Sequence, residues 1–288
     1  MFITRIAPSP TGDFHLGTAR TAYFNWLAAR ASGGRFLLRI DDTDLARNNE
    51  ASVGVIHDCM TWLGLDHDAT FRQSDRLDRY RDVAADLVTR GRAVVADNGA
   101  ILMKDGQSTP WTDRISGLQA VGQAHDALAR NQVLIKADGM PVYHFASVVD
   151  DIDMGVNLVI RGIDHLTNTF RHSAIYAALD APLPEFAHLG LIMLDGRKMS
   201  KRDGAASLLG YRDAGIDPDA MLNFLLRMGW GPAKDDKSMA VIGRDRALGL
   251  FLDGGRMKNS PAAFDAAKLA SYDRKYKAAR RDLAAPAP

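Results

Sequence analysis

The sequence predicts an α/β fold with a parallel sheet, and three successive segments near the start of the chain support this prediction. Residues 2–6 are mostly apolar and are followed by two prolines, which cannot donate to a sheet ladder, so a short strand ends there. Apolar residues recur every three to four positions over residues 16–31, as in a helix, and residues 36–40 form a second apolar run. A strand, a helix and a strand in about forty residues make a βαβ unit, which places a ligand crevice at the carboxyl ends of parallel strands.

The remaining elements follow from the same periodicities. We expect helices over residues 51–63, 77–90, 169–179, 218–228, 244–251 and 261–276, and buried strands over residues 142–149, 156–160 and 188–194. Residues 94–136 are rich in Gly, Asp, Ser and Thr, and a helix over residues 118–129 is the one element that we expect in them. The pattern indicates a sheet that is interrupted by an insertion and followed by a mainly helical segment.

Composition and charge exclude several classes of protein. The chain has 288 residues, 47% of them hydrophobic, and 36 Lys and Arg residues balance 35 Asp and Glu residues. Disordered chains combine few hydrophobic residues with a high net charge, which this chain does not. Because its net charge is only +1, any nucleic acid must bind to a local basic patch. The single cysteine, Cys59, excludes an internal disulfide and a cysteine-cluster zinc or iron–sulfur site. We expect a cytoplasmic protein without a membrane partner, because no stretch approaches the ~18 apolar residues of a membrane span and the start of the chain has no export signal.

Two segments carry the residue types that bind polyphosphates. In residues 8–18 the first strand passes into the first helix, whose N-terminal N–H groups attract phosphate; His15 can donate to an oxygen that gains charge, and Gly17 lets a flat nucleotide approach. Residues 198–202, Lys-Met-Ser-Lys-Arg, can neutralise a departing pyrophosphate. Each segment has an ordinary alternative, which is a capping or packing role for the histidine and a solvated surface for the cations. Their occurrence together in one α/β chain favours a nucleotide site.

These segments, with three further motifs, resemble the class I aminoacyl-tRNA synthetases, and within them the glutamyl-tRNA synthetase family. Residues 5–18, which include His15-Leu16-Gly17-Thr18, are similar to the family's HIGH signature, and residues 198–202 are similar to its KMSKS loop. Residues 40–44, 143–151 and 159–162 are similar to other family blocks, in the same order. The resemblance covers about residues 1–95 and 138–278. It implies a Rossmann-like catalytic domain with a parallel sheet, a short insertion and a C-terminal helical segment that contacts the tRNA stem.

The resemblance implies a two-step reaction. Glutamate and ATP with Mg²⁺ form glutamyl-adenylate and pyrophosphate, and the glutamyl group then passes to the terminal adenosine of a tRNA. The family's catalytic positions correspond to His15, Lys198 and Lys201. Its glutamate-binding positions correspond to Arg5, Ser9, Asp41, Tyr143 and Arg161, and its ATP-binding positions to Ser9, His15, Gly17, Thr18, Asp164, Lys198, Met199, Ser200 and Lys201. The resemblance also implies a preference for glutamate, because the position of Arg161 is typically not basic in the sister glutaminyl enzymes, whose amide substrate needs no such charge, whereas arginine pairs bidentately with a carboxylate.

The chain departs from the family's pattern in four respects. Asp41 stands where the family usually has Glu for the substrate's α-ammonium, and Ile163 stands where an acid usually precedes Asp164. The insertion is much shorter than the family's acceptor-binding insertion, and the chain stops where the family continues into an anticodon-binding domain. We therefore expect a first half of the catalytic domain (1–93), a shortened insertion (94–137), a second half (138–195), the KMSKS loop with stem-contact helices (196–278) and a flexible tail (279–288).

The acceptor stays open. We expect a monomer without zinc that binds tRNA through the acceptor end only, and the basic run 272–281 either meets tRNA phosphates or is a solvated helix. The alternatives are a zinc-less glutamyl-Q tRNA(Asp) synthetase, a glutamate-activating enzyme with a non-tRNA acceptor and an inactive RNA-binding paralogue. A different nucleotidyltransferase has no reason to retain Arg5, Tyr143 and Arg161 together.

Overall fold

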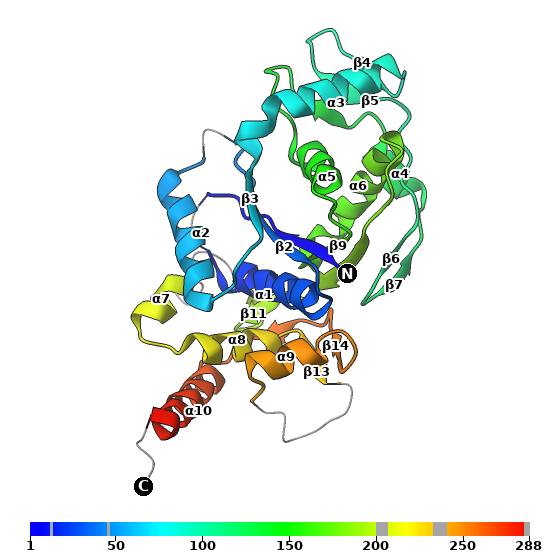
Figure 1. Cartoon of the computed structure of the whole chain (residues 1–288). Coiled ribbons are helices and arrows are strands. Elements are labelled where there is room, and N and C mark those ends of the chain that lie inside the picture. The colour runs from blue at the N-terminus through cyan, green and yellow to red at the C-terminus, as the bar shows by residue number, and fades with distance from the viewer. Residues whose placement is uncertain (12–13, 45–46, 200–206, 233–240, 285–288) are drawn as a thin grey trace.

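A computed structural model of the chain describes residues 1–11, 14–44, 47–199, 207–232 and 241–284 (Figure 1). Its helices are α1 (Leu16–Ala31), α2 (Glu50–Leu63), α3 (Leu77–Thr89), α4 (Gln123–Ala129), α5 (Tyr143–Asp153), α6 (Leu166–Ala178), α7 (Leu208–Asp213), α8 (Pro218–Arg227), α9 (Arg244–Leu250) and α10 (Ala266–Ala284), with 3₁₀ turns at Gln73–Arg76 and Ile163–His165. Its strands are β1 (Ile3–Ile6), β2 (Arg35–Ile40), β3 (Ala69–Arg72), β4 (Ala93–Val95), β5 (Ile101–Met103), β6 (Trp111–Asp113), β7 (Gly117–Gln119), β8 (Val133–Ile135), β9 (Leu158–Gly162), β10 (Glu185–Leu189), β11 (Ile192–Leu194), β12 (Arg197–Lys198), β13 (Trp230–Pro232), β14 (Gly255–Met257) and β15 (Ala262–Ala263). Within these ranges, none of the helices combines the length and the apolarity that a membrane crossing requires.

The predicted parallel sheet is confirmed, and it consists of two halves that meet at β1 and β9. In one half β1, β2 and β3 are parallel in that order; in the other β9 pairs in parallel with β10, followed by β6 and β7. Asn157 joins the halves, because its N–H donates to the Ile3 carbonyl oxygen at 3.1 Å and its side-chain oxygen accepts from the Ile3 N–H at 2.8 Å. The chain leaves β1 toward β2 and leaves β9 toward β10, in opposite directions along the sheet. Such a switch point is where open parallel sheets bind their ligands.

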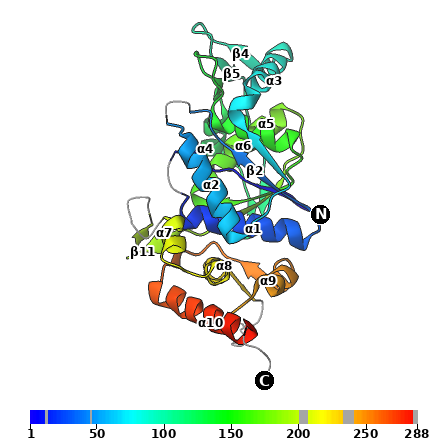
Figure 2. The same cartoon turned by 60° about the vertical axis from the view of Figure 1, so that its left-hand side comes forward.

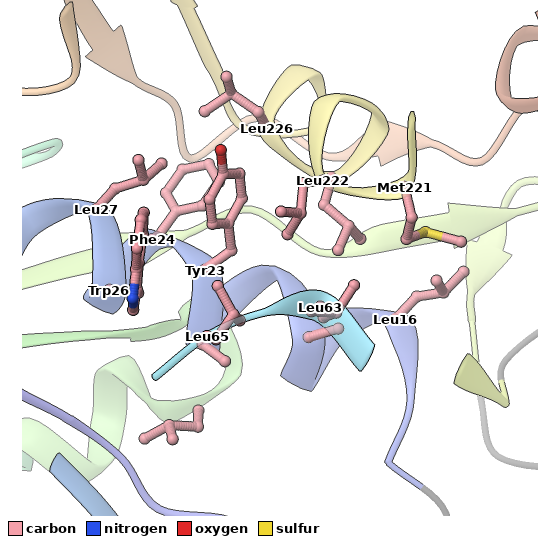
Figure 3. Close-up of a cluster of buried hydrophobic side chains, with 14 of the residues drawn as sticks. Leu16, Tyr23, Phe24, Trp26, Leu27, Leu63, Leu65, Met221, Leu222 and Leu226 are labelled. Atoms are coloured by element: carbon pink, nitrogen blue, oxygen red, sulfur yellow. The ribbon is translucent and has the colours of Figure 1, made fainter. Parts of the chain in front are cut away.

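Helix α1 lies between the sheet and the C-terminal helices (Figures 1 and 2). It begins at Leu16 because the His15 ring caps it, accepting from the Thr18 N–H at 3.2 Å. Figure 3 shows the apolar cluster around it, with Leu16, Tyr23, Phe24, Trp26 and Leu27 of α1, Leu63 at the end of α2 and Leu65 just after it, and Met221, Leu222 and Leu226 of α8. One core therefore extends from the strands through α1 into the C-terminal helices, and α10 packs on the far side of α8 (Figure 2).

Two further apolar clusters hold the rest of the molecule. One joins α3, α5 and α6 to the antiparallel sheet of β4, β5 and β8, and it includes Tyr80 and Phe145. The other surrounds Trp111 of β6, which packs edge-on against Phe170 of α6 and Phe186 of β10. Part of the predicted insertion thus belongs to the main sheet.

The structure differs from the expected elements in several places. Residues 94–136, in which we expected one helix and no strand, hold β5, β6, β7 and β8 besides α4, and β3 was not expected. Residues 142–149 are not a strand but open α5, of which seven residues are buried; a helix that is buried on most sides lacks the helical spacing of apolar residues. Residues 188–194 belong to two strands, β10 and β11, with Gly190 between them, where a Cβ would lie 2.1 Å from the Ser260 backbone oxygen. Residues 118–129 hold the end of β7 before α4 begins, and the mainly helical C-terminal part also contains β13, β14 and β15.

Candidate active site

A cavity of about 770 Å³ opens where β1 and β9 end, at the switch point of the sheet. Its wall includes the ends of these two strands, the start of α1 and part of the β11–β12 hairpin. The predicted site residues that line it are Arg5, Ser9, His15, Gly17, Thr18, Tyr143, Arg161, Asp164, Lys198 and Met199. The fold therefore brings the HIGH-like turn, the start of the KMSKS-like loop and the predicted glutamate-binding arginines to one place.

Of the predicted site residues that the structure describes, Asp41 alone is not in this wall. Ser200 and Lys201 lie outside the described residues. Asp41 is buried, and both of its carboxylate oxygens accept from Arg39, at 2.6 Å from Nε and 3.2 Å from Nη2. Burial raises the pKa of Asp41, although Arg39 opposes the rise. The roles predicted for these three residues stay predictions.

His15 lines the cavity, and one of its ring nitrogens caps α1. Its Nδ1 accepts from the Thr18 N–H at 3.2 Å, so the proton of the neutral ring lies on Nε2, which is 3.2 Å from the Thr18 hydroxyl. The structure explains why position 17 is a glycine, since a Cβ there would lie only 3.1 Å from His15 Nδ1. The start of α1 thus combines helix N–H groups with an imidazole N–H, which suits a phosphate group.

Lys198 of β12 donates to Asp164 Oδ2 at 2.7 Å. Burial alone would raise the pKa of Asp164, but the hydrogen bond from Lys198 and the charges of His165 and Lys198 together outweigh it, and the pKa lies below its usual value. The two side chains are 56% and 40% exposed, so the pair contributes little to stability, about 0–1 kcal/mol. Lys198 can therefore exchange this partner for a phosphate at small cost.

Two arginines in the wall, Arg5 and Arg39, have acidic partners. Asp151 of α5 accepts from Arg5 through both of its oxygens, at 3.0 and 3.2 Å, and from Arg39 Nη1 at 2.7 Å. Burial alone would raise the pKa of Asp151, but Arg5 and Arg39 together hold it below its usual value. Arg39 also pairs with Asp41 at 2.6 Å and lies 3.6 Å from Asp150, so acidic neighbours neutralise both arginines.

Arg161 differs from them because its partners are neutral. Its Nε donates to His188 Nε2 at 3.1 Å, its Nη2 donates to Thr169 Oγ1 at 2.6 Å, and its Nη1 lies 3.5 Å from His172 Nδ1. The residue is 6% exposed, and no carboxylate of the described residues lies within ion-pair distance of it. Burial lowers the pKa of Arg161, but a guanidinium stays charged in proteins. The wall thus holds a fixed positive charge that an acidic ligand can neutralise.

Sequence reasoning missed several residues of this site. Arg20 lies in the wall, one helical turn after Gly17, and this spacing could have revealed it. It donates to the carbonyl oxygens of Met228 at 2.7 Å and Gly190 at 2.5 Å, and burial lowers its pKa to about 10. Arg39 is an interior residue of a buried strand, and no motif marks His188, so neither had a local signal.

Comparisons with known proteins point to the same family as the motifs. The family described as tRNA synthetases class I (E and Q), catalytic domain, matches residues 1–116 and 101–270. Glutamate–tRNA ligase 2 of Neorickettsia sennetsu is 46% identical over 278 residues, covering 95% of this chain and 66% of that protein. Glutamate–tRNA ligase 1 of Rubrobacter xylanophilus is 43% identical over 279 residues, covering 94% of this chain and 63% of that protein.

Solved structures agree with these relatives. The crystal structure of a glutamate tRNA ligase from Elizabethkingia meningosepticum, in complex with its amino acid, has a TM-score of 0.79 at 28% identity and covers 96% of this chain and 69% of that one. A putative arginyl-tRNA synthetase from Campylobacter jejuni shares the fold, with a TM-score of 0.62 at 15% identity. The chain spans slightly less than two thirds of the length of the curated relatives, 66% of the first and 63% of the second. The family match, the identity of these relatives and the shared fold together show that the chain belongs to the class I tRNA synthetases of the glutamate and glutamine group, in the region of their catalytic domain.

Proposed function

We propose that the cavity binds L-glutamate beside ATP, forms glutamyl-adenylate, and passes the glutamyl group to the 3′-terminal adenosine of a tRNA. The observation that carries this proposal is the buried charge of Arg161, which has only neutral partners among the described residues. An acidic side chain supplies the missing negative charge, whereas the amide of glutamine does not. The names of the relatives, which are glutamate–tRNA ligases at 43–46% identity, support the same substrate.

The side-chain carboxylate of glutamate would bind to Arg161, with Arg5 and Tyr143 beside it, since all three line the cavity. For the α-ammonium we propose Asp41 and Ser9. Because Arg39 already donates to both oxygens of Asp41, the ammonium would use the remaining lone pairs or a bridging water. This arrangement places the α-carboxylate toward the start of α1, where ATP would lie.

The adenylation step needs orientation and charge stabilisation. An oxygen of the α-carboxylate attacks the α-phosphorus of ATP, the bond from that phosphorus to the oxygen of the β-phosphate breaks, and pyrophosphate leaves, so no proton has to move. We propose that His15 donates to the α-phosphate and that Lys198 and Lys201 neutralise the pyrophosphate, while Gly17, Thr18, Met199 and Ser200 shape the ATP site. Mg²⁺ enters with the phosphates of ATP and usually keeps only one or two carboxylate ligands. Within the described part of the wall, the carboxylate that suits it is Asp164.

The proposal keeps the five segments that the sequence predicts, which are residues 1–93, 94–137, 138–195, 196–278 and 279–288. Residues 94–137 and α10 would face the acceptor arm of the tRNA, with the basic side chains Lys268, Arg274 and Lys275 of α10 toward its phosphates. Since β6 of the insertion pairs with β10, the insertion and the second half of the catalytic domain share one sheet. We propose that the chain acts as a monomer, which size-exclusion chromatography with light scattering would test.

The decisive test measures AMP formation by the purified chain with MgATP, purified total tRNA and L-glutamate, L-glutamine or L-aspartate. We expect AMP and acylated tRNA with glutamate, and at least about 100-fold less with glutamine, given the size of a lost charged pair. Selective use of another amino acid would refute the proposed substrate.

Periodate treatment of the tRNA identifies the acceptor. Oxidation of the terminal ribose should abolish acylation if the 3′ adenosine is the acceptor. Acylation of tRNA from which the 3′-terminal adenosine has been removed would favour the glutamyl-Q alternative, and glutamate-dependent AMP without acylated tRNA would favour a non-tRNA acceptor. ATP binding without any activation would indicate an inactive RNA-binding paralogue.

A further inference from the structure

Arg161 is held by a chain of hydrogen bonds that starts outside the cavity, at Asp113 of β6. Asp113 is 1% exposed, and its Oδ1 accepts from the backbone N–H groups of Ile115 and Ser116, both at 2.9 Å. Its Oδ2 accepts from the backbone N–H of His188 at 3.0 Å and lies 2.7 Å from His188 Nδ1. Burial alone would raise the pKa of Asp113, but the hydrogen bonds from His188 and the backbone hold it below its usual value. The carboxylate is therefore ionised and fixed in one orientation.

His188 can occupy this place in only one protonation state. A carboxylate only accepts and an arginine only donates, so Nδ1 must carry the proton for Asp113 and Nε2 must be bare for the Arg161 Nε–H. The other tautomer or a doubly protonated ring would direct an N–H at the guanidinium. Burial lowers the pKa of His188, which agrees with a neutral ring. Asp113 thus selects the tautomer that lets His188 accept from Arg161.

The remaining donors of Arg161 match one carboxylate. A guanidinium has five N–H groups; two of them donate to His188 and Thr169, and a third faces His172 Nδ1 at 3.5 Å, which accepts when the proton of that ring lies on Nε2. One N–H is left on each terminal nitrogen, and two such donors bind the two oxygens of a carboxylate bidentately. A carboxylate in the place of His188 would hold the arginine equally well, but it would also neutralise it. The neutral histidine fixes the guanidinium and leaves its charge to the ligand.

We propose that Asp113, acting through His188, is a positioning residue that gives the Arg161 site its selectivity for an acidic side chain. This inference rests on the proposed function, because it assigns the acid to L-glutamate. Asp113 lies in the predicted insertion, 75 residues before His188 in the chain. The insertion would thus contribute to the choice of amino acid as well as to any contact with tRNA.

The test compares ligand affinities of purified variants by isothermal titration calorimetry. In Asp113→Asn the amide oxygen can still accept from the backbone of Ile115 and Ser116, but its NH₂ group would face both the backbone N–H and Nδ1 of His188 and favour the ring proton on Nε2, toward Arg161. We expect the Kd for L-glutamate to rise about tenfold or more, while the Kd for L-glutamine and MgATP changes less than about threefold. His188→Phe should act in the same direction. His188→Gln should restore part of the affinity, because one amide can donate to Asp113 and accept from Arg161.

The matched control is Glu185→Gln, which also changes a carboxylate to an amide next to β6 and β10. Glu185 pairs with Arg114 at 2.5 Å near the surface, so its loss should leave all three Kd values unchanged. A wild-type chain that fails to bind glutamate would refute the proposed function itself. If the wild type binds glutamate, an Asp113→Asn variant with a wild-type melting temperature and a glutamate Kd within twofold would refute this inference alone, as would an equal loss of affinity for glutamate and glutamine. Should Asp113→Asn fail to fold, equal glutamate affinities of His188→Gln and His188→Phe would also refute it.

Discussion

The substitution Arg161→Gln should remove most of the preference for glutamate over glutamine. Two N–H groups of Arg161 remain for a ligand after His188, Thr169 and His172 have taken theirs. A hydrogen bond to a charged group contributes about 1.5–3 kcal/mol, so the two together account for about 3–6 kcal/mol. Because Arg5 and Tyr143 stay in the wall, the loss should lie near the lower end, which corresponds to a factor of about 100 in kcat/KM for glutamate.

The measurement is kcat/KM for AMP formation with glutamate and with glutamine, in the presence of total tRNA. We expect the ratio of the two values to fall about 100-fold, chiefly through KM for glutamate, because Arg161 touches the side chain rather than the reacting carboxylate. Arg114→Gln is the matched control, since Arg114 is paired with Glu185 away from the cavity wall and should leave the ratio unchanged. A ratio within threefold of wild type, with an unchanged melting temperature, would show that the charge of Arg161 does not select the substrate.

Three further predictions concern stability and are measured by urea unfolding. Burial lowers the pKa of His144 to about 4, whereas an unfolded histidine titrates near 6.5, so acidification from pH 7.5 to 5 favours the unfolded chain, which binds the proton more readily. The share of His144, discounted for its partial exposure, is about 1–2 kcal/mol at pH 5; His144→Gln should lose correspondingly less stability on acidification, and an equal loss would contradict this assignment. Leu222→Ala, at a site 2% exposed between α8 and α1, should cost about 2–5 kcal/mol, whereas Leu118→Ala, at a site 71% exposed, should change the free energy of unfolding by no more than about 0.5 kcal/mol; similar costs would refute the assigned core. Gly54→Ala in α2, where an added Cβ meets nothing within 4 Å, should stabilise by about 0.5–1 kcal/mol. At Gly34 the Cβ would lie 1.8 Å from the Phe2 backbone oxygen, so Gly34→Ala should destabilise by more than about 2 kcal/mol, and the opposite order of these two variants would contradict the fold around β1.

The first βαβ unit could be predicted because its signals are local. Helix α1 begins beside its capping residue His15 and ends before Gly33, whose φ of 65° suits a glycine, so residues adjacent in sequence set both ends. Helix α5 could not be predicted in the same way, since its burial comes from α3 and α6, and a run such as Phe145-Ala146-Ser147-Val148-Val149 looks the same in a buried strand.

In the candidate site, too, residues with local sequence signals could be predicted, and residues placed by distant parts of the chain could not. The residues of its wall that belong to motifs were found through the resemblance, and the structure brings them together. Asp113 and His188 were not found, because their roles arise from pairing between strands that are far apart in the chain. Arg39 was not found because its partner Asp151 lies in α5, 112 residues further along the chain. Asp113 lies in a stretch whose composition resembles that of a loop, and only the parallel pairing of β6 with β10 places it behind Arg161.

The position of α1 between the sheet and α8 limits how this chain can be cut or recombined. Tyr23, Phe24 and Leu27 are each at most 1% exposed, and part of their cover comes from the C-terminal helices. A chain that ended before α8 would expose part of these side chains to water, at a cost of at most about 1.5–3 kcal/mol for each. The C-terminal helices therefore cannot be exchanged with those of a relative as a separate module, unless the facing side of α1 is transplanted with them.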